Sequence, residues 1–183
     1  MTKEEIKEKW PILDSFATLK KASWDKTKNE YMTESAIEVV DFDKLPKKFA
    51  KGKGWSGVPK STDALYIDLP SWTFIEFKNG SVEKCDIHRK IYDSILMLLE
   101  LNIIPDMDYV RQNVRYILVC KEEQSSTAQK SPHQEKFKSY MEARSKDEVV
   151  RFELKKLRDY LLAEVHTYSP EEFETMFVGK LVE

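Results

Sequence analysis

The segment from Ser61 to Gly80 constrains the fold more than any other part of this sequence. A short apolar run that opens on Asp63 is followed by a second run, Trp72 to Lys78, that carries two charged residues. The aromatic and β-branched residues of the second run are typical of a β-strand. Alternation along a strand places Glu76 and Lys78 on one face and their apolar neighbours on the other. The segment therefore predicts a β-hairpin with charged groups on one face of an otherwise apolar strand.

If the two runs pair across Pro70-Ser71, Leu65 lies opposite Glu76 and Asp63 lies opposite Lys78. A four-residue loop keeps the same faces. Two acids and a lysine then share one patch, which suits a hard divalent cation and an ammonium beside an attacking water. An ordinary ion pair between Asp63 and Lys78 at a solvent-facing edge is the alternative, and the pattern leaves both interpretations open.

The spacing acid-x-Lys occurs in three places, which begin at Glu5, Glu76 and Glu153. Because 34% of the residues are charged, such matches are expected by chance. The first and third lie in charge-rich sequence that favours helices. Only the second interrupts an apolar strand, where a charged group is costly unless it is paired or bound to a ligand.

The chain as a whole is typical of one cytoplasmic domain of 183 residues. No apolar leader or membrane-spanning run is present. Two cysteines and three histidines lack the spacing of zinc ligands or of a disulfide framework: Cys85, Cys120, His88, His133 and His166. The net charge of -2 argues against a general nucleic-acid coat protein.

Basic residues occur close together in two segments of the sequence, and in both they are candidates for binding phosphate groups. The run from Lys44 to Lys60 predicts a flexible basic loop in which Lys51 and Lys53 contact a nucleic-acid backbone. Arg89 and Lys90 fall in the first turns of a predicted helix and are candidates for the same role. A solvated surface loop is the alternative for the first of these two runs.

The rest of the chain predicts alternating helices and strands. Helices are expected over 3–9, 25–40, 86–101 (with Asp86 as the N-cap) and 147–162, and from Pro170 onward; strands over 114–120 and 164–168; and a mobile loop over 121–134. Glu30, Glu34 and Glu38 lie on the predicted solvent side of the second helix, so no chemistry is assigned to them. A single domain is expected, with a helical extension over 1–24, a core over 25–120, a mobile loop over 121–135 and a helix-and-strand part over 136–183.

This order of elements resembles the PD-(D/E)XK nuclease superfamily, whose core is a helix, a three-stranded meander, a helix and a further strand. Asp63, Glu76 and Lys78 take the places of its motif. The resemblance implies a restriction-endonuclease-like α/β fold, a small mixed sheet flanked by helices, with extra C-terminal helices. It also implies a metal-dependent nuclease in which Asp63, Glu76 and the Phe77 carbonyl hold Mg²⁺ or Mn²⁺ and Lys78 orients the attacking water.

The sequence departs from the family pattern in three respects. Thr62 stands where many members have proline, the helix after the lysine lacks a glutamine, and a strand before Asp63 is hard to see. A catalytically inactive, nuclease-like binding or regulatory module is therefore the alternative function. A partner-binding helical protein is a more remote possibility, because aromatic residues such as Trp10, Trp24 and Trp55 more often belong to a core. The partner expected under the first two hypotheses is DNA or RNA.

Overall fold

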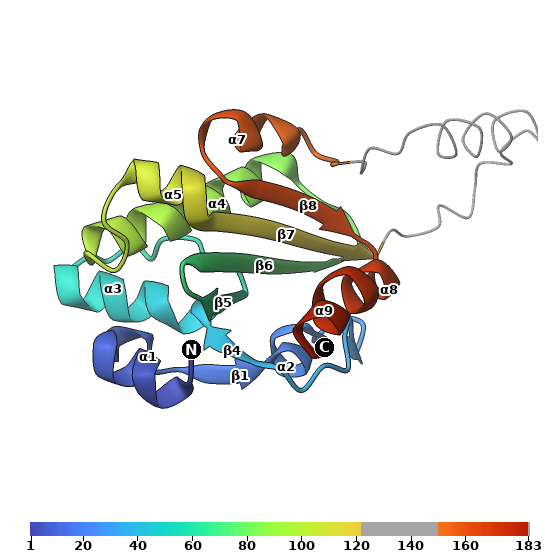
Figure 1. The fold of residues 1–183 in the computed structure, drawn as a ribbon, viewed down its shortest axis with the longest axis horizontal. Helices are drawn as coiled ribbons and strands as arrows, with labels where there is room; N and C mark the ends of the chain where they lie inside the picture. The colour runs from blue at the N-terminus through green and yellow to red at the C-terminus, as the bar shows by residue number, and fades with distance from the viewer. Residues whose placement is uncertain (122–149, 183) are drawn as a thin grey trace, which may run out of the picture.

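The computed structural model describes residues 1–121 and 150–182 and places a mixed six-stranded sheet at the centre of the chain (Figure 1). The strand order is β1-β4-β5-β6-β7-β8. The strands are β1 Phe16–Thr18, β4 Glu38–Asp41, β5 Ala64–Asp68, β6 Ser71–Asn79, β7 Val114–Lys121 and β8 Glu164–Tyr168. A separate two-stranded sheet pairs β2 Trp24–Asp25 with β3 Glu30–Tyr31.

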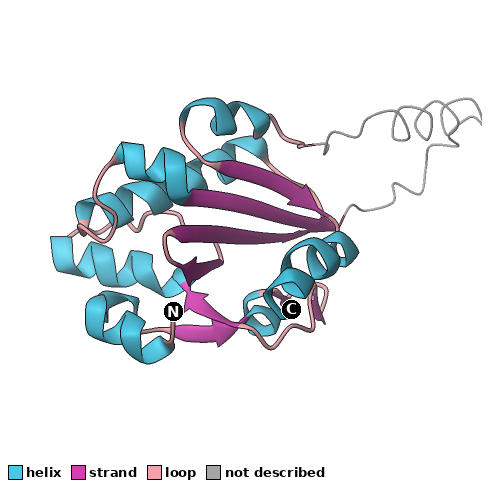
Figure 2. Ribbon diagram, viewed as in Figure 1, coloured by secondary structure: helices cyan, strands magenta, loops and turns pink. Residues whose placement is uncertain are grey.

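Helices connect and cover the strands (Figure 2). They are α1 Lys3–Lys9, α2 Leu19–Ala22, α3 Leu45–Lys53, α4 Lys84–Glu100, α5 Met107–Asn113, α7 Lys155–Tyr160, α8 Pro170–Phe173 and α9 Gly179–Val182. Single 3₁₀ turns lie at Pro11–Leu13 and Phe42–Lys44, and a π-helical turn at Glu174–Val178 joins α8 to α9. The predicted α/β class, a mixed sheet flanked by helices, is confirmed.

The sheet has an antiparallel half and a parallel half. Strands β4, β5 and β6 form an antiparallel meander, whereas β6, β7 and β8 run parallel. Helix α4 lies between β6 and β7 in the chain, as a parallel crossover requires. Both faces of β6 are buried, and this explains why its sequence is almost continuously apolar.

Two apolar clusters fill the space on the two faces of the sheet. One contains Phe74 of β6 together with side chains of α1, α3, α4, α5 and α7, including Ile87 and Ile91 of α4. The other contains Phe77 of β6, Leu19 of α2 and Phe173 of α8. Glu76 therefore belongs to the face covered by α4, because even-numbered residues of β6 share the face of Phe74.

The predicted hairpin forms, but its register differs by two residues. Leu65 pairs with Phe74 rather than Glu76, and Asp68 pairs with Ser71. The chain reverses over Leu69 and the proline that follows it, joined by a cis peptide bond. Proline has no N–H for the ladder and is therefore suited to the connection itself. A shift of two residues preserves the faces, so the side-chain orientation was predicted correctly.

The predicted helix over 25–40 is wrong. Asp25 accepts hydrogen bonds from the backbone N–H groups of Thr27 and Lys28, which makes a turn between β2 and β3. Asn29 completes the turn with φ of 53°. The end of the segment forms β4, which is the strand before Asp63 that the sequence did not reveal. The N-terminal extension is also not purely helical, since β1 pairs with β4 in the main sheet.

Two further boundaries differ from expectation. Much of the predicted basic loop is helix α3, which ends at Gly54 in the left-handed region that glycine favours. Helix α4 begins at Lys84 after the N-cap Glu83, so Asp86 lies in its first turn and is not its N-cap.

The C-terminal elements follow the prediction more closely. Strands β7 and β8 lie where expected, and Ser169 forms a capping box with Glu172 at the start of α8. Of the long helix predicted over 147–162, residues 147–149 lie outside the described residues and the described part forms only α7, whose neighbourhood buries Leu154, Leu157 and Leu161. Apart from Lys121, the predicted mobile loop falls outside the described residues. Among those described, no helix combines the length and the apolar character that a membrane span needs.

Candidate functional site

The fold brings the three predicted site residues to one end of the sheet. Asp63 immediately precedes β5, and Glu76 and Lys78 lie near the end of β6, its antiparallel neighbour. The backbone N–H of Phe77 donates to Asp63 Oδ2 over 2.7 Å. This bond holds the Asp63 carboxylate beside β6 where the ladder between the strands ends.

Lys90 of α4 completes the centre of this site. Its Nζ atom lies 2.6 Å from Glu76 Oε1 and 3.4 Å from Asp63 Oδ1. The Lys90 side chain is 14% exposed and that of Glu76 is fully buried. Instead of facing solvent as a contact for phosphate, Lys90 joins the two carboxylates inside the protein. The ion pair predicted between Asp63 and Lys78 is replaced by one between Asp63 and Lys90.

Lys78 extends the site toward solvent. Its Nζ atom lies 3.2 Å from Glu76 Oε1 and 3.7 Å from Asp86 Oδ2. Asp86 also binds Lys60, with 2.7 Å between Lys60 Nζ and Asp86 Oδ1. We call the six residues of this alternating chain of charges the charged cluster: Lys60, Asp63, Glu76, Lys78, Asp86 and Lys90.

Burial dominates the electrostatics at the centre of the cluster. Burial, reinforced by the Asp63 carboxylate, raises the pKa of Glu76 to about 8. Burial also raises the pKa of Asp63 to about 6, although Lys90 opposes the shift. For Lys90, burial acts to lower the pKa, but Asp63 and Glu76 outweigh it and raise the pKa above its ordinary value. The cost of desolvating the Asp63 and Glu76 carboxylates is therefore larger than the favourable interaction with the Lys90 ammonium.

The donor set at the centre fits a hard divalent cation. Glu76 Oε2 is buried without a hydrogen-bond partner among the described residues. Phe77 points its N–H toward Asp63, and because the N–H and C=O of one strand residue face the same neighbour, its carbonyl oxygen faces that side too. The described residues contain no group of three or more His, Cys, Asp or Glu that could hold a metal. Two carboxylates and a backbone oxygen nevertheless suit Mg²⁺, which keeps several waters and binds substrate phosphates.

A hollow of about 400 Å³ opens beside the candidate site. Asp43, Asp63 and Lys78 line one part of it, and residues 22–26 line another. The hollow gives a ligand access to the exposed side of the charged cluster.

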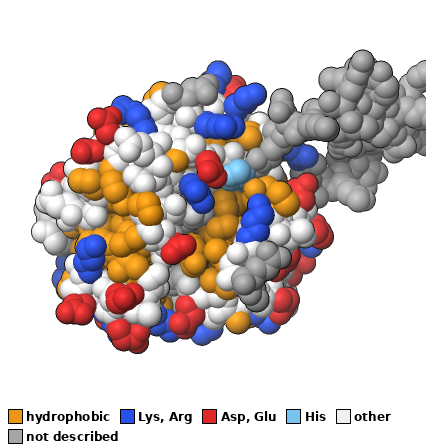
Figure 3. Space-filling model, in the orientation of Figure 1, with side chains coloured by type: hydrophobic (Ala, Val, Ile, Leu, Met, Phe, Trp, Pro, Cys, Tyr) orange, Lys and Arg blue, Asp and Glu red, His pale blue; other side chains and the backbone are white. Residues whose placement is uncertain are grey.

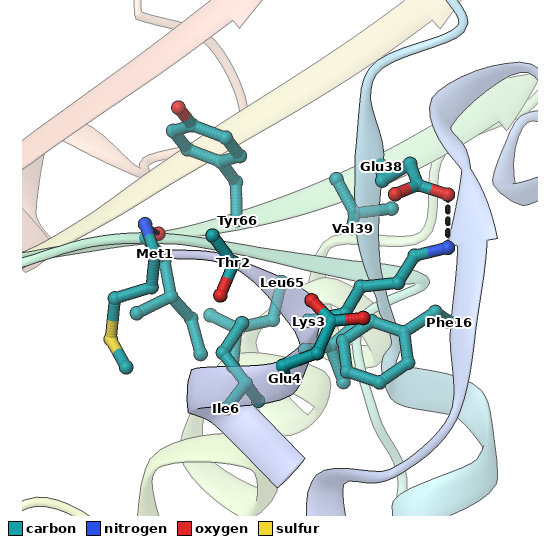
Figure 4. A pocket seen from close by; sticks show the side chains of 12 residues that line it. Met1, Thr2, Lys3, Glu4, Ile6, Phe16, Glu38, Val39, Leu65 and Tyr66 are labelled. Carbon is teal, nitrogen blue, oxygen red and sulfur yellow. Dashed lines mark hydrogen bonds and ion pairs between the residues drawn. The ribbon is translucent and has the colours of Figure 1, made fainter.

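A second hollow, of about 410 Å³, lies between α1 and strands β4 and β5 (Figure 4). Figure 4 shows apolar side chains such as Leu65 and Phe16 in its walls and an ion pair between Lys3 and Glu38 at its edge. The first hollow borders Asp63 and Lys78 of the charged cluster and the second borders no member of it, so we treat the first hollow as part of the site.

The other basic residues named from the sequence lie outside the charged cluster. Lys53 pairs with Glu100, and Lys51 is exposed on α3. Arg89 pairs with Asp93 on its own helix. On the face shown in Figure 3, acidic and basic side chains of the described residues are interspersed, with apolar side chains between them. Two of the residues predicted to contact phosphate, Lys53 and Arg89, thus form ion pairs with acidic side chains of the protein instead.

Sequence reasoning missed four residues of this region. Asp43 lines the hollow and accepts a hydrogen bond from Ser61, but it followed a segment interpreted as a helix. The β-branched pair before Asp41 was the signal for a strand there. Asp86 was interpreted as an N-cap and Lys60 as part of a loop. The fourth residue, Tyr116, is fully buried on β7, where burial and the Glu76 carboxylate raise the pKa of the Tyr116 hydroxyl.

Comparison with known proteins adds no relative. No family model matches the sequence, and neither a curated protein nor a solved structure shows a significant match. The case for function therefore depends on the geometry of the site.

Proposed function

We propose that this protein is a metal-dependent nuclease that hydrolyses nucleic-acid phosphodiesters at Asp63, Glu76 and Lys78. The observation that carries the proposal is the convergence of the fully buried Glu76 and the partly exposed Asp63 with Lys78 and Lys90, where Asp63 and Lys78 line a hollow. Structural ion pairs also perturb pKa values, but a cleft beside strongly shifted carboxyls is typical of functional sites.

The order of elements supports the same proposal. The meander β4-β5-β6, the crossover helix α4 and the parallel strand β7 follow the order of the restriction-endonuclease-like core. Asp63 precedes β5, the middle strand of the meander, and Glu76 and Lys78 lie on the next strand, where that family carries its acid-x-Lys.

Each residue has a distinct role in the proposed reaction. Asp63, Glu76 and the Phe77 carbonyl would hold Mg²⁺ or Mn²⁺, which supplies Lewis-acid polarisation of the phosphodiester and a lowered pKa for water. Lys78, whose side chain is 26% exposed, would orient the attacking water and stabilise the charge that develops on the phosphate oxygens. Lys90 fixes the positions of both carboxylates from helix α4, which covers this face of the sheet.

Cleavage assays with Lys78→Ala test the proposal. The wild-type protein, with Mg²⁺ or Mn²⁺, should cleave labelled DNA or RNA, and the variant should lose at least about 100-fold in rate, since one stabilising donor is typically worth that much. Lys155→Ala, which alters the exposed acid-x-Lys match at Glu153, is the matched control and should leave the rate unchanged. Wild-type protein that cleaves no DNA or RNA substrate with either metal would refute the proposed activity.

An inactive binding module is the second candidate, and the position of Lys90 favours it. Its ammonium already lies between the two carboxylates, where it supplies positive charge. Metal-dependent thermal stability distinguishes the candidates. At ten times its Kd, a cation bound to the native state adds about 1.4 kcal/mol of stability. Asp63→Ala combined with Glu76→Ala should remove this gain, whereas no gain in the wild type favours the module.

A further inference from the structure

The hollow beside the charged cluster has a wall that the proposed nuclease core does not supply. Residues Ala22 to Lys26, with Met32, form one side, and Lys78 and Asn79 at the end of β6 form the other. Its volume of about 400 Å³ lies at the lower end of the range for small-ligand pockets. A single nucleotide is on this scale, whereas a duplex is much larger.

Hydrogen bonds hold this wall in place. The hydroxyl of Ser23 accepts from the backbone N–H groups of Met32 and Thr33, at 3.1 and 3.3 Å. Glu30 of β3 binds Lys121 at the end of β7, with 3.0 Å between Lys121 Nζ and the carboxylate. The turn between β2 and β3 is therefore fixed to the same end of the sheet as the candidate site.

Two side chains of this wall have the chemistry to bind a nucleotide. Trp24 is half-buried, lines the hollow and packs on Tyr31 with 4.5 Å between ring centroids. An indole ring gives a stacking surface to any base. Lys26 is exposed, also lines the hollow, and forms no ion pair with the residues that the structure describes. Its ammonium is therefore available to a phosphate.

We propose that this hollow holds one unpaired nucleotide next to the phosphodiester that is cleaved, with its base stacked on Trp24 and a phosphate near Lys26. The substrates are then single-stranded or frayed nucleic acids. This inference rests on the proposed function, because Asp63 and Lys78 must be the place where the phosphodiester reacts.

Base pairing explains why a duplex is disfavoured. A base in a duplex is stacked on its neighbours, and its removal from the stack costs free energy that an unpaired base does not lose. Stacking on one aromatic side chain raises affinity by about 5- to 150-fold per base. A site that depends on Trp24 therefore selects strands whose bases are already unpaired.

Binding measured by fluorescence anisotropy tests this inference independently of cleavage. The Lys78→Ala protein with Mg²⁺ is mixed with labelled oligo(dT), oligo(rU) and a DNA duplex. We expect tighter binding of the single strands, and the two single strands compare DNA with RNA. Trp24→Ala should weaken single-strand binding by about 5- to 150-fold, while Trp24→Phe should retain most of it. Trp55→Ala, which removes an exposed tryptophan that does not line the hollow, should have no effect.

Lys26→Ala gives a second test at an exposed position. It should weaken binding and reduce the slope of log affinity against log salt by about 0.7, the value for one phosphate contact on a single strand. Equal effects of Trp24→Ala and Trp55→Ala, or tighter binding of the duplex, overturn the inference. Cleavage that does not depend on Trp24 overturns it while leaving the proposed nuclease intact, whereas Trp24-dependent binding without wild-type cleavage refutes the nuclease.

Discussion

Two of the three acid-x-Lys matches in this protein have opposite electrostatic outcomes. In Glu76-Phe77-Lys78 the acid is fully buried, and burial raises its pKa to about 8. In Glu153-Leu154-Lys155 the acid is exposed, and hydrogen bonds from Lys84 and Lys156 lower its pKa to about 2. The pattern alone therefore says little about chemistry.

Burial and a second acid at the same site create the difference. Asp63 precedes the neighbouring strand and Lys90 projects from α4, so both reach Glu76 only in the folded chain. Glu153 has solvent around it and two flexible lysines as partners. A buried acid that the fold leaves under-compensated has a reason to bind a cation, whereas a solvated one does not.

Lys90→Met should produce the largest change in stability. It leaves Asp63 and Glu76 buried without their main counter-charge, and removal of one partner from a buried ion pair costs about 3–5 kcal/mol. We expect this loss in the free energy of unfolding at pH 7, measured by urea denaturation. At pH 5 the loss should be smaller, because both carboxyl groups are then largely protonated.

Lys156→Met is the control in the other region. Lys156 lies 3.1 Å from Glu153, but both side chains are exposed and Glu153 retains Lys84. No change beyond experimental error is expected. Equal losses in the two variants would mean that burial does not distinguish the two regions.

Much of the fold could be predicted because periodicity reports burial. The apolar alternation of β6, the continuous run of β7 and the capping residues before α8 are local signals, and each element formed where expected. The segment over 25–40 failed because Asp25 and Ser23 satisfy backbone groups through their side chains. Apolar spacing gives no warning of such turns.

The convergence of Asp63, Glu76 and Lys78 at one end of the sheet was predictable, but their ion-pair partners were not. Strand alternation placed Glu76 and Lys78 on one face, and the error of two residues in register preserved that face. The contact of Lys90 with both acids required the position of α4 over the sheet, which no local pattern gives. Lys90 was therefore predicted as a surface ligand for phosphate, although its neighbours are Asp63 and Glu76.

The dependence of stability on pH should have opposite signs in the two regions. The pKa of Glu76 is raised from 4.5 to about 8, so the native state binds an extra proton and stability falls as pH rises between these values. Glu76→Gln should reduce this fall by on the order of 3 kcal/mol between pH 5 and 8. Urea denaturation at several pH values measures both slopes.

Glu153→Gln should act in a different pH range. The pKa of Glu153 is lowered from 4.5 to about 2, so its contribution is present above pH 4.5 and is lost as pH falls toward 2. The variant should show the same dependence of stability on pH as the wild type between pH 5 and 8, and a weaker loss of stability in acid. A change in the neutral range would contradict the assignment of that slope to Glu76.

Asp86→Asn should have a small effect on stability, because the exposure of Asp86 lies between that of Glu76 and that of Glu153. It is 28% exposed, and hydrogen bonding to Lys60 lowers its pKa. Replacement should cost less than about 1 kcal/mol at pH 7, as for other solvent-accessible pairs. Asp108→Asn, which breaks an exposed pair with Arg111, provides the control for a surface charge.

Asp86 nevertheless holds Lys78 at the rim of the hollow, so the two variants should differ in activity. Asp86→Asn should lower metal-dependent cleavage several-fold, because Lys78 loses one of its two carboxylate partners, while Asp108→Asn should leave cleavage unchanged. A loss of stability as large as that of Lys90→Met would mean that the charged cluster behaves as one buried unit. A small loss accompanied by reduced cleavage would instead separate a buried centre, which fixes the carboxylates, from a solvated rim, which positions Lys78 for the substrate.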